Sequence, residues 1–175
     1  MKKLLLLVIL SCHLTSCQSP KDKDSQNSYE PSIIGYEFNE EGEKLNLIAG
    51  DISITDLYLE YIQAHNDKNS SKIFEMDTDD IKVKAANGSV FNGRKAHKKE
   101  LDAWFTSSSP IWKVKWMIAN TVQGKDGKNQ SWLTTGVDVF QTLDGNNITS
   151  HHVVDINFVN GKIKELNAYD RASEK

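Results

Sequence analysis

Cysteine is almost absent from this chain of 175 residues, which contains only Cys12 and Cys17. Both lie within the first 17 residues, so everything that follows has no thiol. A disulfide framework, a zinc–thiolate cluster and a cysteine nucleophile are therefore excluded from the remainder of the chain, because each of them needs cysteine there.

The chain also lacks an excess of positive charge. It has 21 Lys and Arg residues against 24 Asp and Glu residues, and without Lys2 and Lys3 the balance is 19 against 24, a net charge of −5. Proteins that bind nucleic acid need a basic face to neutralise phosphates. We therefore expect no nucleic-acid partner.

Long hydrophobic runs are missing as well. The apolar run Leu4–Leu10 follows Lys2 and Lys3 and has only seven residues, whereas a membrane-spanning helix needs about 20. A basic start followed by a short apolar run is typical of a cleaved signal peptide.

The end of this run, "LTSC" from Leu14 to Cys17, resembles a bacterial lipobox, in which the cysteine receives the lipid. Cys12 fits this pattern less well because Leu10 occupies a position where a small residue is wanted. The alternative is an ordinary secretory signal with a chance cysteine. We predict a signal peptide over residues 1–16 and lipidation of Cys17, with palmitate among its acyl chains.

Several acyl chains on one cysteine hold a protein firmly on a membrane, whereas a single chain binds only marginally. The expected location is the cell envelope, with the protein lipid-anchored to the outer membrane on its periplasmic side or at the cell surface.

Residues 17–50 are expected to form a lipidated tether followed by an N-terminal arm. The segment 18–31 is almost without apolar residues and cannot offset its own ordering entropy. Within it, "KDKD" at 21–24 either resembles the export signals of some Bacteroidetes surface lipoproteins or is a chance charge run. The segment Ile33–Gly50 is either a strand or an extended arm. Residues 51–175 are long enough for one domain with a single core.

Hydrophobic spacing predicts helices, then a short hairpin, then another helix and four long strands. The helices are expected over Ser53–Asn66, Ser70–Met76 and Gly93–Phe105, the hairpin over Ile81–Asn92, and the strands over Ile111–Gln123, Ser131–Leu143, Ile148–Val159 and Lys162–Asp170. Ser53 with Asp56 three residues later predicts an N-terminal helix cap. Long strands joined by tight turns form an antiparallel sheet whose apolar face helices must cover, which is an α+β fold.

Three segments carry a family resemblance: "LYLEYIQAHNDKN", then "VFNGRKAH" leading into a helix, then "DINFVNGKIKELNAYD". Their order and spacing are similar to the nuclear transport factor 2-like (NTF2-like, or cystatin-like) superfamily, including its SnoaL-like branch, over residues 52–171. The resemblance implies a curved antiparallel sheet wrapped around the helices as a cone, with a pocket at its open end.

Strand pairing predicts which side chains face that pocket. A two-residue turn at Asn160-Gly161 places Phe158 opposite Ile163 and His152 opposite Tyr169 on the inner face. A one-residue bulge would invert these assignments. The same alternation places further residues on the inner face, namely Leu133, Thr135, Val137, Val139, Trp112, Val114, Trp116, Ile118, Glu165 and Asn167.

Catalysis would need a proton-transferring group on this face. His152 with Tyr169 or Glu165 is the candidate set, because a modest environmental shift brings imidazole to working pH; the alternative is a hydrogen-bonded pair at the rim of the core. In ketosteroid-isomerase-like relatives a general-base Asp lies where this chain has Ala85 or Ala86. SnoaL-like relatives use an acidic residue near the end of the last strand, which Asp170 matches, although the predicted pairing turns Asp170 outward.

We therefore predict a pocket that binds a small, mostly apolar molecule without catalysis, and without a cofactor. An acid–base isomerase or hydrolase and a non-catalytic interaction module are the alternatives. The predicted ligand-binding residues, which could equally be core, are Tyr58, Tyr61, His97, Trp104, Trp112, Trp116, Thr135, His152, Asn167 and Tyr169. No metal site is expected, because the spacing of Asp138, His151 and Asp155 is wrong for a compact one.

The opposite face of the sheet is predicted to be apolar too. Its expected members are Met117, Ala119, Phe140, Val153, Val159, Leu166 and Ala168. Large exposed apolar patches commonly mark an interface, and relatives in this superfamily often dimerise through this side. We expect a homodimer; the alternative is that the Ile33–Phe38 arm covers the patch within one chain.

Overall fold

The computed structural model describes residues 31–171. The predicted signal peptide, Cys17 and most of the predicted tether lie outside these residues. No helix in the described part of the chain is long and apolar enough to cross a membrane.

The helices lie where their periodicity predicts. They are α1 (Ser53–Asn66), α2 (Ser70–Met76) and α3 (Arg94–Ser108). The predicted cap of α1 is wrong, because the side chain of Ser53 caps nothing; instead the Asp51 carboxylate accepts the backbone N–H of Ser53 at 2.9 Å. Asp51 thus stabilises the same helix end that Ser53 was expected to cap.

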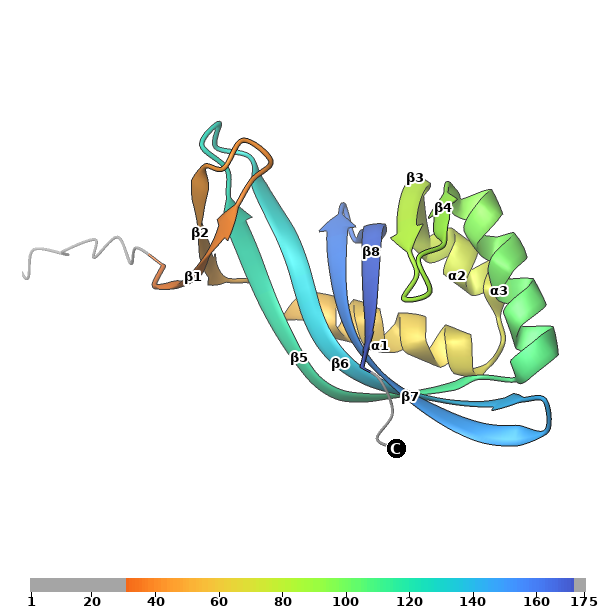
Figure 1. Ribbon diagram of the computed structural model, residues 1–175. Helices are drawn as coiled ribbons and strands as arrows, with labels where there is room; N and C mark the ends of the chain where they lie inside the picture. Colours follow the sequence, from red (N-terminus) through yellow and green to blue (C-terminus); the bar gives the residue numbers. More distant parts are fainter. Residues whose placement is uncertain (1–30, 172–175) are drawn as a thin grey trace, which may run out of the picture. The chain divides into compact units, whose positions relative to one another are not determined.

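The strands form one eight-stranded sheet in the order β1-β2-β5-β6-β7-β8-β3-β4. Their bounds are β1 Ile33–Phe38, β2 Lys44–Ala49, β3 Asp77–Lys84, β4 Val90–Asn92, β5 Ile111–Gln123, β6 Asn129–Leu143, β7 Asn146–Val159 and β8 Lys162–Arg171. Every pairing is antiparallel except that of β3 with β8. Figure 1 shows β5, β6 and β7 curving around α1, so the concave, or inner, face of the sheet meets the helices.

The core lies between this inner face and the helices. One side of α1 is buried through Tyr58, Tyr61, Ile62 and His65, the i, i+3, i+4, i+7 pattern of an amphipathic helix. Opposite it, the predicted inner row of β6 is confirmed, because Leu133, Thr135, Val137 and Val139 are all buried.

The turn between β6 and β7 has two residues, Asp144 and Gly145, so Leu143 pairs with Asn146. His152 therefore lies opposite Val137, whereas a four-residue loop from Leu143 to Ile148, as expected from the sequence, would place it opposite Val139. The face was predicted correctly, because moving the register by two residues leaves every side chain on the same side.

A bulge in β5 makes the predicted faces wrong for the residues that follow it. Val114 pairs with Val137 and Trp116 with Gly136, so Lys115 is the extra residue. Beyond it, Trp116 and Ile118 lie on the outer face and Met117 packs against the core. The predicted inner positions of Trp116 and Ile118 and the predicted outer positions of Met117 and Ala119 are therefore wrong.

A second bulge, in β8, likewise reverses the faces of the residues that follow it. Phe158 pairs with Ile163 as predicted, but Asn157 then pairs with Glu165, so Lys164 is the extra residue. From that point Tyr169 pairs with Val153 and His152 with Asp170. The predicted His152–Tyr169 pair is wrong, and Leu166 and Ala168 belong to the inner face instead of the outer one.

The segment left open as a strand or an arm forms the hairpin β1–β2. Its second strand pairs with the end of β5, with Asn46 opposite Gln123 and Ala49 opposite Asn120. An ion pair between Lys125 and Glu43, at 2.6 Å, joins the β1–β2 turn to the β5–β6 turn. The arm therefore extends the sheet at its edge.

Candidate functional site

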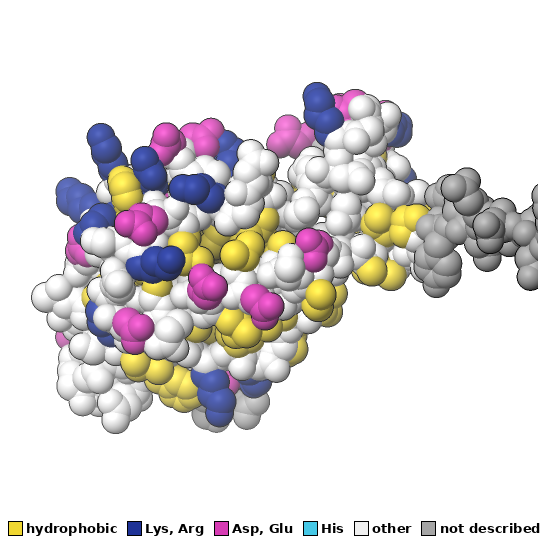
Figure 2. Space-filling model, turned by 180° about the vertical axis from the view of Figure 1, so that it is seen from behind, with side chains coloured by type: hydrophobic (Ala, Val, Ile, Leu, Met, Phe, Trp, Pro, Cys, Tyr) yellow, Lys and Arg dark blue, Asp and Glu magenta, His cyan; other side chains and the backbone are white. Residues whose placement is uncertain are grey.

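A cavity of about 510 Å³ lies between the helices and the inner face of the sheet. Its apolar lining comes from α1 and from the sheet, with Tyr58, Ile62, Val83, Val137, Val154, Leu166 and Ala168. Its polar lining is Tyr61, His65, Asn87, His97, Glu100, Ser108, Gln141, Ser150, His152 and Asp170. In the view of Figure 2 hydrophobic and charged side chains share the surface and no histidine is visible.

Aromatic rings form one wall of the cavity. The rings of Trp104 and Trp112 meet edge to face with centroids 5.0 Å apart, and Trp112 meets His65 in the same way at 4.9 Å. The indole N–H of Trp104 donates to the side-chain oxygen of Gln141 at 2.9 Å. This bond connects α3 to β6.

His65 is held as a neutral ring. Its Nδ1 lies 2.8 Å from the Tyr61 carbonyl oxygen, and because a carbonyl only accepts, Nδ1 carries the proton and Nε2 is an acceptor. Burial lowers the pKa of His65 to about 3, well below its ordinary value. His65 therefore presents an uncharged imidazole to the cavity.

His97 has a different partner. It extends from the first turn of α3, and its Nδ1 lies 2.8 Å from Asp77 Oδ2. Asp77, at the start of β3, is only 1% exposed, and its other oxygen accepts the hydroxyl of Tyr61 at 3.2 Å. Burial, and then the charge of Asp77, raise the pKa of Tyr61 well above its usual value, so the phenol keeps its proton and donates it.

Toward the other side of the cavity His152 faces Asp170, with 3.9 Å between Nε2 and Oδ1. Burial lowers the pKa of His152, against the opposing effect of Asp170. His151 points the opposite way and pairs with Asp138 on the outer face at 2.7 Å. Among the described residues no cluster of three His, Cys, Asp or Glu side chains is placed to hold a metal ion.

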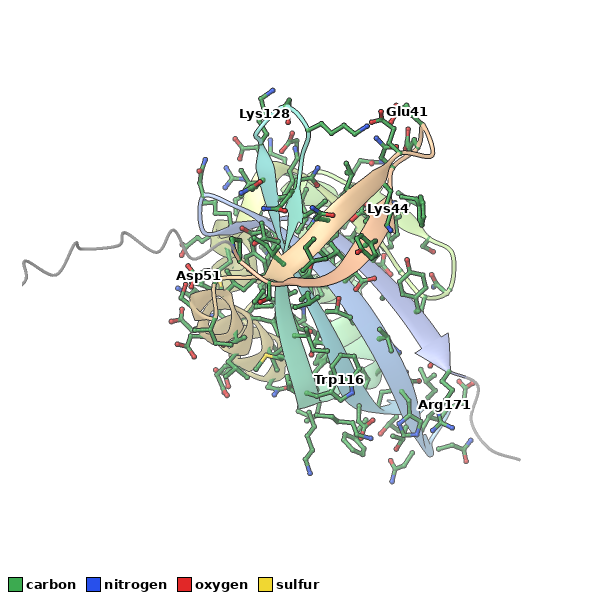
Figure 3. The ribbon with its side chains drawn as sticks, turned by 90° about the vertical axis from the view of Figure 1, so that its left-hand side faces the viewer. Glu41, Lys44, Asp51, Trp116, Lys128 and Arg171 are labelled. Atoms are coloured by element: carbon green, nitrogen blue, oxygen red, sulfur yellow. The ribbon has the colours of Figure 1, made fainter. Side chains whose placement is uncertain are left out.

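The structure brings six of the ten predicted ligand-binding residues to the cavity wall: Tyr58, Tyr61, His97, Trp104, Trp112 and His152. Thr135 is buried behind it and donates to the backbone oxygen of Trp116. Trp116, Asn167 and Tyr169 do not line the cavity, because the two bulges turn them outward. Figure 3 shows Trp116 on the side of the sheet away from the helices.

Of the catalytic candidates, only His152 lines the cavity. Glu165 is turned outward by the β8 bulge and forms an ion pair with Lys84 at 2.6 Å. Asp170, expected to point outward, lines the cavity instead. The predicted partners of His152, Tyr169 and Glu165, are therefore wrong.

Sequence reasoning missed Asp77, which falls between the helix expected over Ser70–Met76 and the hairpin expected over Ile81–Asn92. Extending the alternation of Ile81 and Val83 backward by four residues would have placed Asp77 on the inner face. Sequence reasoning also gave no role to His65, which lies on the buried side of α1.

No protein-family model matches this sequence, and no curated protein matches it. Solved structures do. An epoxide hydrolase/cyclase-like enzyme of pyran ring formation in the polyether salinomycin, SalBIII, superposes with a TM-score of 0.57 at 18% identity, covering 68% of this chain and 91% of the other. An uncharacterised cystatin-fold protein from Novosphingobium aromaticivorans gives 0.53 at 16% identity, covering 67% and 98%.

An NTF2-like protein of unknown function from Mesorhizobium loti gives a TM-score of 0.51 at 12% identity, covering 68% of this chain and 91% of the other. The fold is NTF2-like. The predicted α+β class and cystatin-like architecture are thus confirmed. Proteins with this fold include enzymes and proteins without a known activity, so the fold alone decides no function. The SnoaL-like branch stays a prediction.

Proposed function

We propose that this NTF2-like domain binds a small, mostly apolar molecule in its cone. The observation that supports this most is the cavity of about 510 Å³, which falls within the range of about 300–1,000 Å³ typical of small-molecule sites. Its walls combine apolar side chains with a few polar groups on several elements, which is the arrangement that holds an apolar ligand and fixes its orientation.

A pure interaction module with a filled cone fits less well. Such a module would need the large aromatic residues to occupy the interior. Trp104 and Trp112 line the cavity but leave its volume open, and Trp116 lies on the outer face. Open apolar volume next to buried polar groups favours a ligand.

Filling the cavity tests the proposal. Ala168 lines it, whereas the neighbouring Tyr169 points outward, so Ala168→Phe should block binding and Tyr169→Phe should not. A naphthalene sulfonate dye, whose apolar rings fluoresce more strongly on leaving water, reports occupancy. We expect saturable binding by wild type and by Tyr169→Phe, and at least about tenfold weaker binding by Ala168→Phe, about 1.4 kcal/mol.

Equal binding by all three proteins would place the dye elsewhere and count against the cone. Because a folded variant is required, each protein is first checked by circular dichroism. The comparison between adjacent residues of one strand separates loss of the cavity from general damage to β8.

We also propose that the domain is held at a membrane of the cell envelope by lipid on Cys17. The support is the basic start at Lys2, the short apolar run Leu4–Leu10 and the lipobox-like "LTSC". Cys17→Ser should release the protein into the soluble fraction and abolish labelling by a fatty-acid precursor, while Cys12→Ser should change neither. Unaltered membrane partition of Cys17→Ser would contradict the anchor.

A further inference from the structure

Burial of Asp77 at this position is energetically unfavourable. A carboxylate taken out of water costs several kcal/mol unless it is paired and hydrogen-bonded, and Asp77 is 1% exposed beside an apolar cavity. Its hydrogen-bonding partners are two side chains, Tyr61 through Oδ1 and His97 through Oδ2. Both of these partners line the cavity, and Asp77 itself does not.

This arrangement fixes the orientation of the His97 ring. Nδ1 is turned to Asp77, and Nε2 has no hydrogen-bond partner in the described residues. With its proton on Nδ1, the neutral ring carries a free electron pair on Nε2. A carboxylate behind an imidazole orients the ring and stabilises the imidazolium that forms when Nε2 takes a proton.

The neighbouring groups suit that chemistry. His65 adds a second uncharged imidazole on the same cavity, held by the Tyr61 carbonyl oxygen. Positive charge developing on His97 is stabilised by the Asp77 carboxylate that contacts its ring, and little water is available to screen this attraction because His97 is only 5% exposed.

We propose that His97, oriented by Asp77 and Tyr61, is a general base that takes a proton from the molecule bound in the cavity. This inference rests on the proposed function, since it requires a ligand in the cone. The ligand class that fits is an apolar molecule with an acidic proton: a phenol, an enol, or a ketone with an acidic neighbouring C–H.

The step balances within the site. The O–H or C–H bond of the ligand breaks and leaves its electron pair on the ligand as a phenolate or enolate, while the proton bonds to His97 Nε2. The imidazolium is then paired with Asp77, and Tyr61 keeps its own proton. Return of the proton to the same atom is exchange, and return to a different atom is isomerisation, so no further reactant is needed.

The chain supplies a matched control. His151 and Asp138 form a similar pair, with 2.7 Å between Nδ1 and Oδ1, but on the outer face of the sheet. His97→Gln keeps a side-chain N–H able to bond Asp77 and removes the base, and His151→Gln makes the same change outside the cavity. Asp77→Asn keeps the size of the positioning residue and removes its charge.

The probe is 4-nitrophenol, whose neutral and ionised forms absorb at different wavelengths, titrated at a pH one unit below its own pKa. Binding is followed separately by quenching of tryptophan fluorescence, since Trp104 and Trp112 line the cavity. We expect wild type and His151→Gln to raise the ionised-to-neutral ratio of the bound phenol about tenfold, the equivalent of one pKa unit. In His97→Gln the phenol should bind in its neutral form, and Asp77→Asn should lie between the two.

Binding by wild type without added ionisation, or ionisation that persists in His97→Gln, would overturn the proton transfer and leave the proposed ligand binding standing. Failure of 4-nitrophenol to bind while the naphthalene dye binds would overturn the inferred ligand class. Failure of both molecules to bind would count against the proposed function itself.

Discussion

Two histidines on the cavity wall are held by opposite kinds of partner. His65 donates to a backbone carbonyl, and burial outweighs this bond and keeps its ring neutral, whereas His97 bonds a carboxylate, whose negative charge can pair with a charged ring. Identical side chains thus acquire different protonation chemistry within one site, as their environments dictate.

Burial of His65 makes the stability of the domain depend on pH. Its pKa is about 3 in the folded chain against an ordinary value of 6.5. Between these values the unfolded chain binds the proton and the folded chain does not, so stability rises with pH. Acidification from pH 6.5 toward pH 3 should therefore lower the free energy of unfolding by about 1.4 kcal/mol per pH unit through this group.

Urea unfolding of wild type and of His65→Gln at a series of pH values measures that slope. The free energy of unfolding of the variant should fall less steeply on acidification, by the contribution of one histidine, whatever its value at neutral pH. His152, whose pKa burial also lowers, contributes in the same direction to both proteins and cancels in the comparison. Parallel curves for the two proteins would contradict the neutral, buried state of His65.

Asp77 shows why individual site residues escaped prediction. It belongs to the polar sequence "DTDD", so only the alternation of Ile81 and Val83, continued backward, indicates its face, and its residue type argues against burial. What places it inside is the packing of α3 and the two side-chain donors, Tyr61 and His97, that approach from separate elements. Such long-range pairing leaves no local sequence signal.

At the scale of elements, periodicity and turn residues predicted α1 and α2 to the residue and the long strands to within a few positions. The faces of β6 and β7 followed correctly because the turn residues determine their pairing. The faces of β5 and β8 did not, since each contains one extra residue, Lys115 or Lys164. A bulge reverses the alternation beyond it, and no residue type marked either one.

The junction between the arm and the sheet depends on one glycine. Gly50 donates its N–H to the Ala119 carbonyl at 3.0 Å, and a Cβ there would lie 2.7 Å from the backbone nitrogen of Asn120. The backbone at Gly50 and that of β5 cannot move apart to make room for a Cβ without losing this hydrogen bond. Gly50→Ala should therefore destabilise the domain by about 1–3 kcal/mol, as overpacking does, and should speed proteolysis within β1 and β2.

Gly35→Ala is the matched control, because a Cβ at Gly35 meets only the Leu47 side chain at an ordinary 3.6 Å. It should leave the free energy of unfolding within about 1 kcal/mol of wild type. Equal behaviour of the two variants in urea unfolding and limited proteolysis would show that the arm does not dock on β5 as described.

At the scale of the whole molecule, the outer face of the sheet remains apolar even though its membership changed. Trp116, Ile118, Phe140, Val153 and Tyr169 are each more than two-fifths exposed. The arm leaves them uncovered, because it extends the sheet at the β5 edge. The homodimer expected from the sequence therefore stays a prediction, with a different set of residues at its centre.

Sedimentation of residues 32–175, which lack the predicted lipid anchor, tests this prediction. We expect a dimer for wild type, a monomer for Trp116→Lys, and a dimer for Phe38→Lys, which introduces the same charge at an exposed apolar side chain on the arm. A wild-type monomer at every concentration would contradict an interface between copies of this chain, and dissociation by Phe38→Lys would move it to the arm.

The claim that the cone holds a small, mostly apolar molecule is tested most directly by native mass spectrometry of the full chain. The Cys17→Ser background avoids added lipid mass, and the protein is purified without ligand exchange. We predict an added mass of one small organic molecule, released on activation, on the protein with an intact cavity and on Tyr169→Phe, and its loss from Ala168→Phe. A chain that carries no added mass even after incubation with an extract of small apolar molecules, or an Ala168→Phe variant that retains it, would contradict the account.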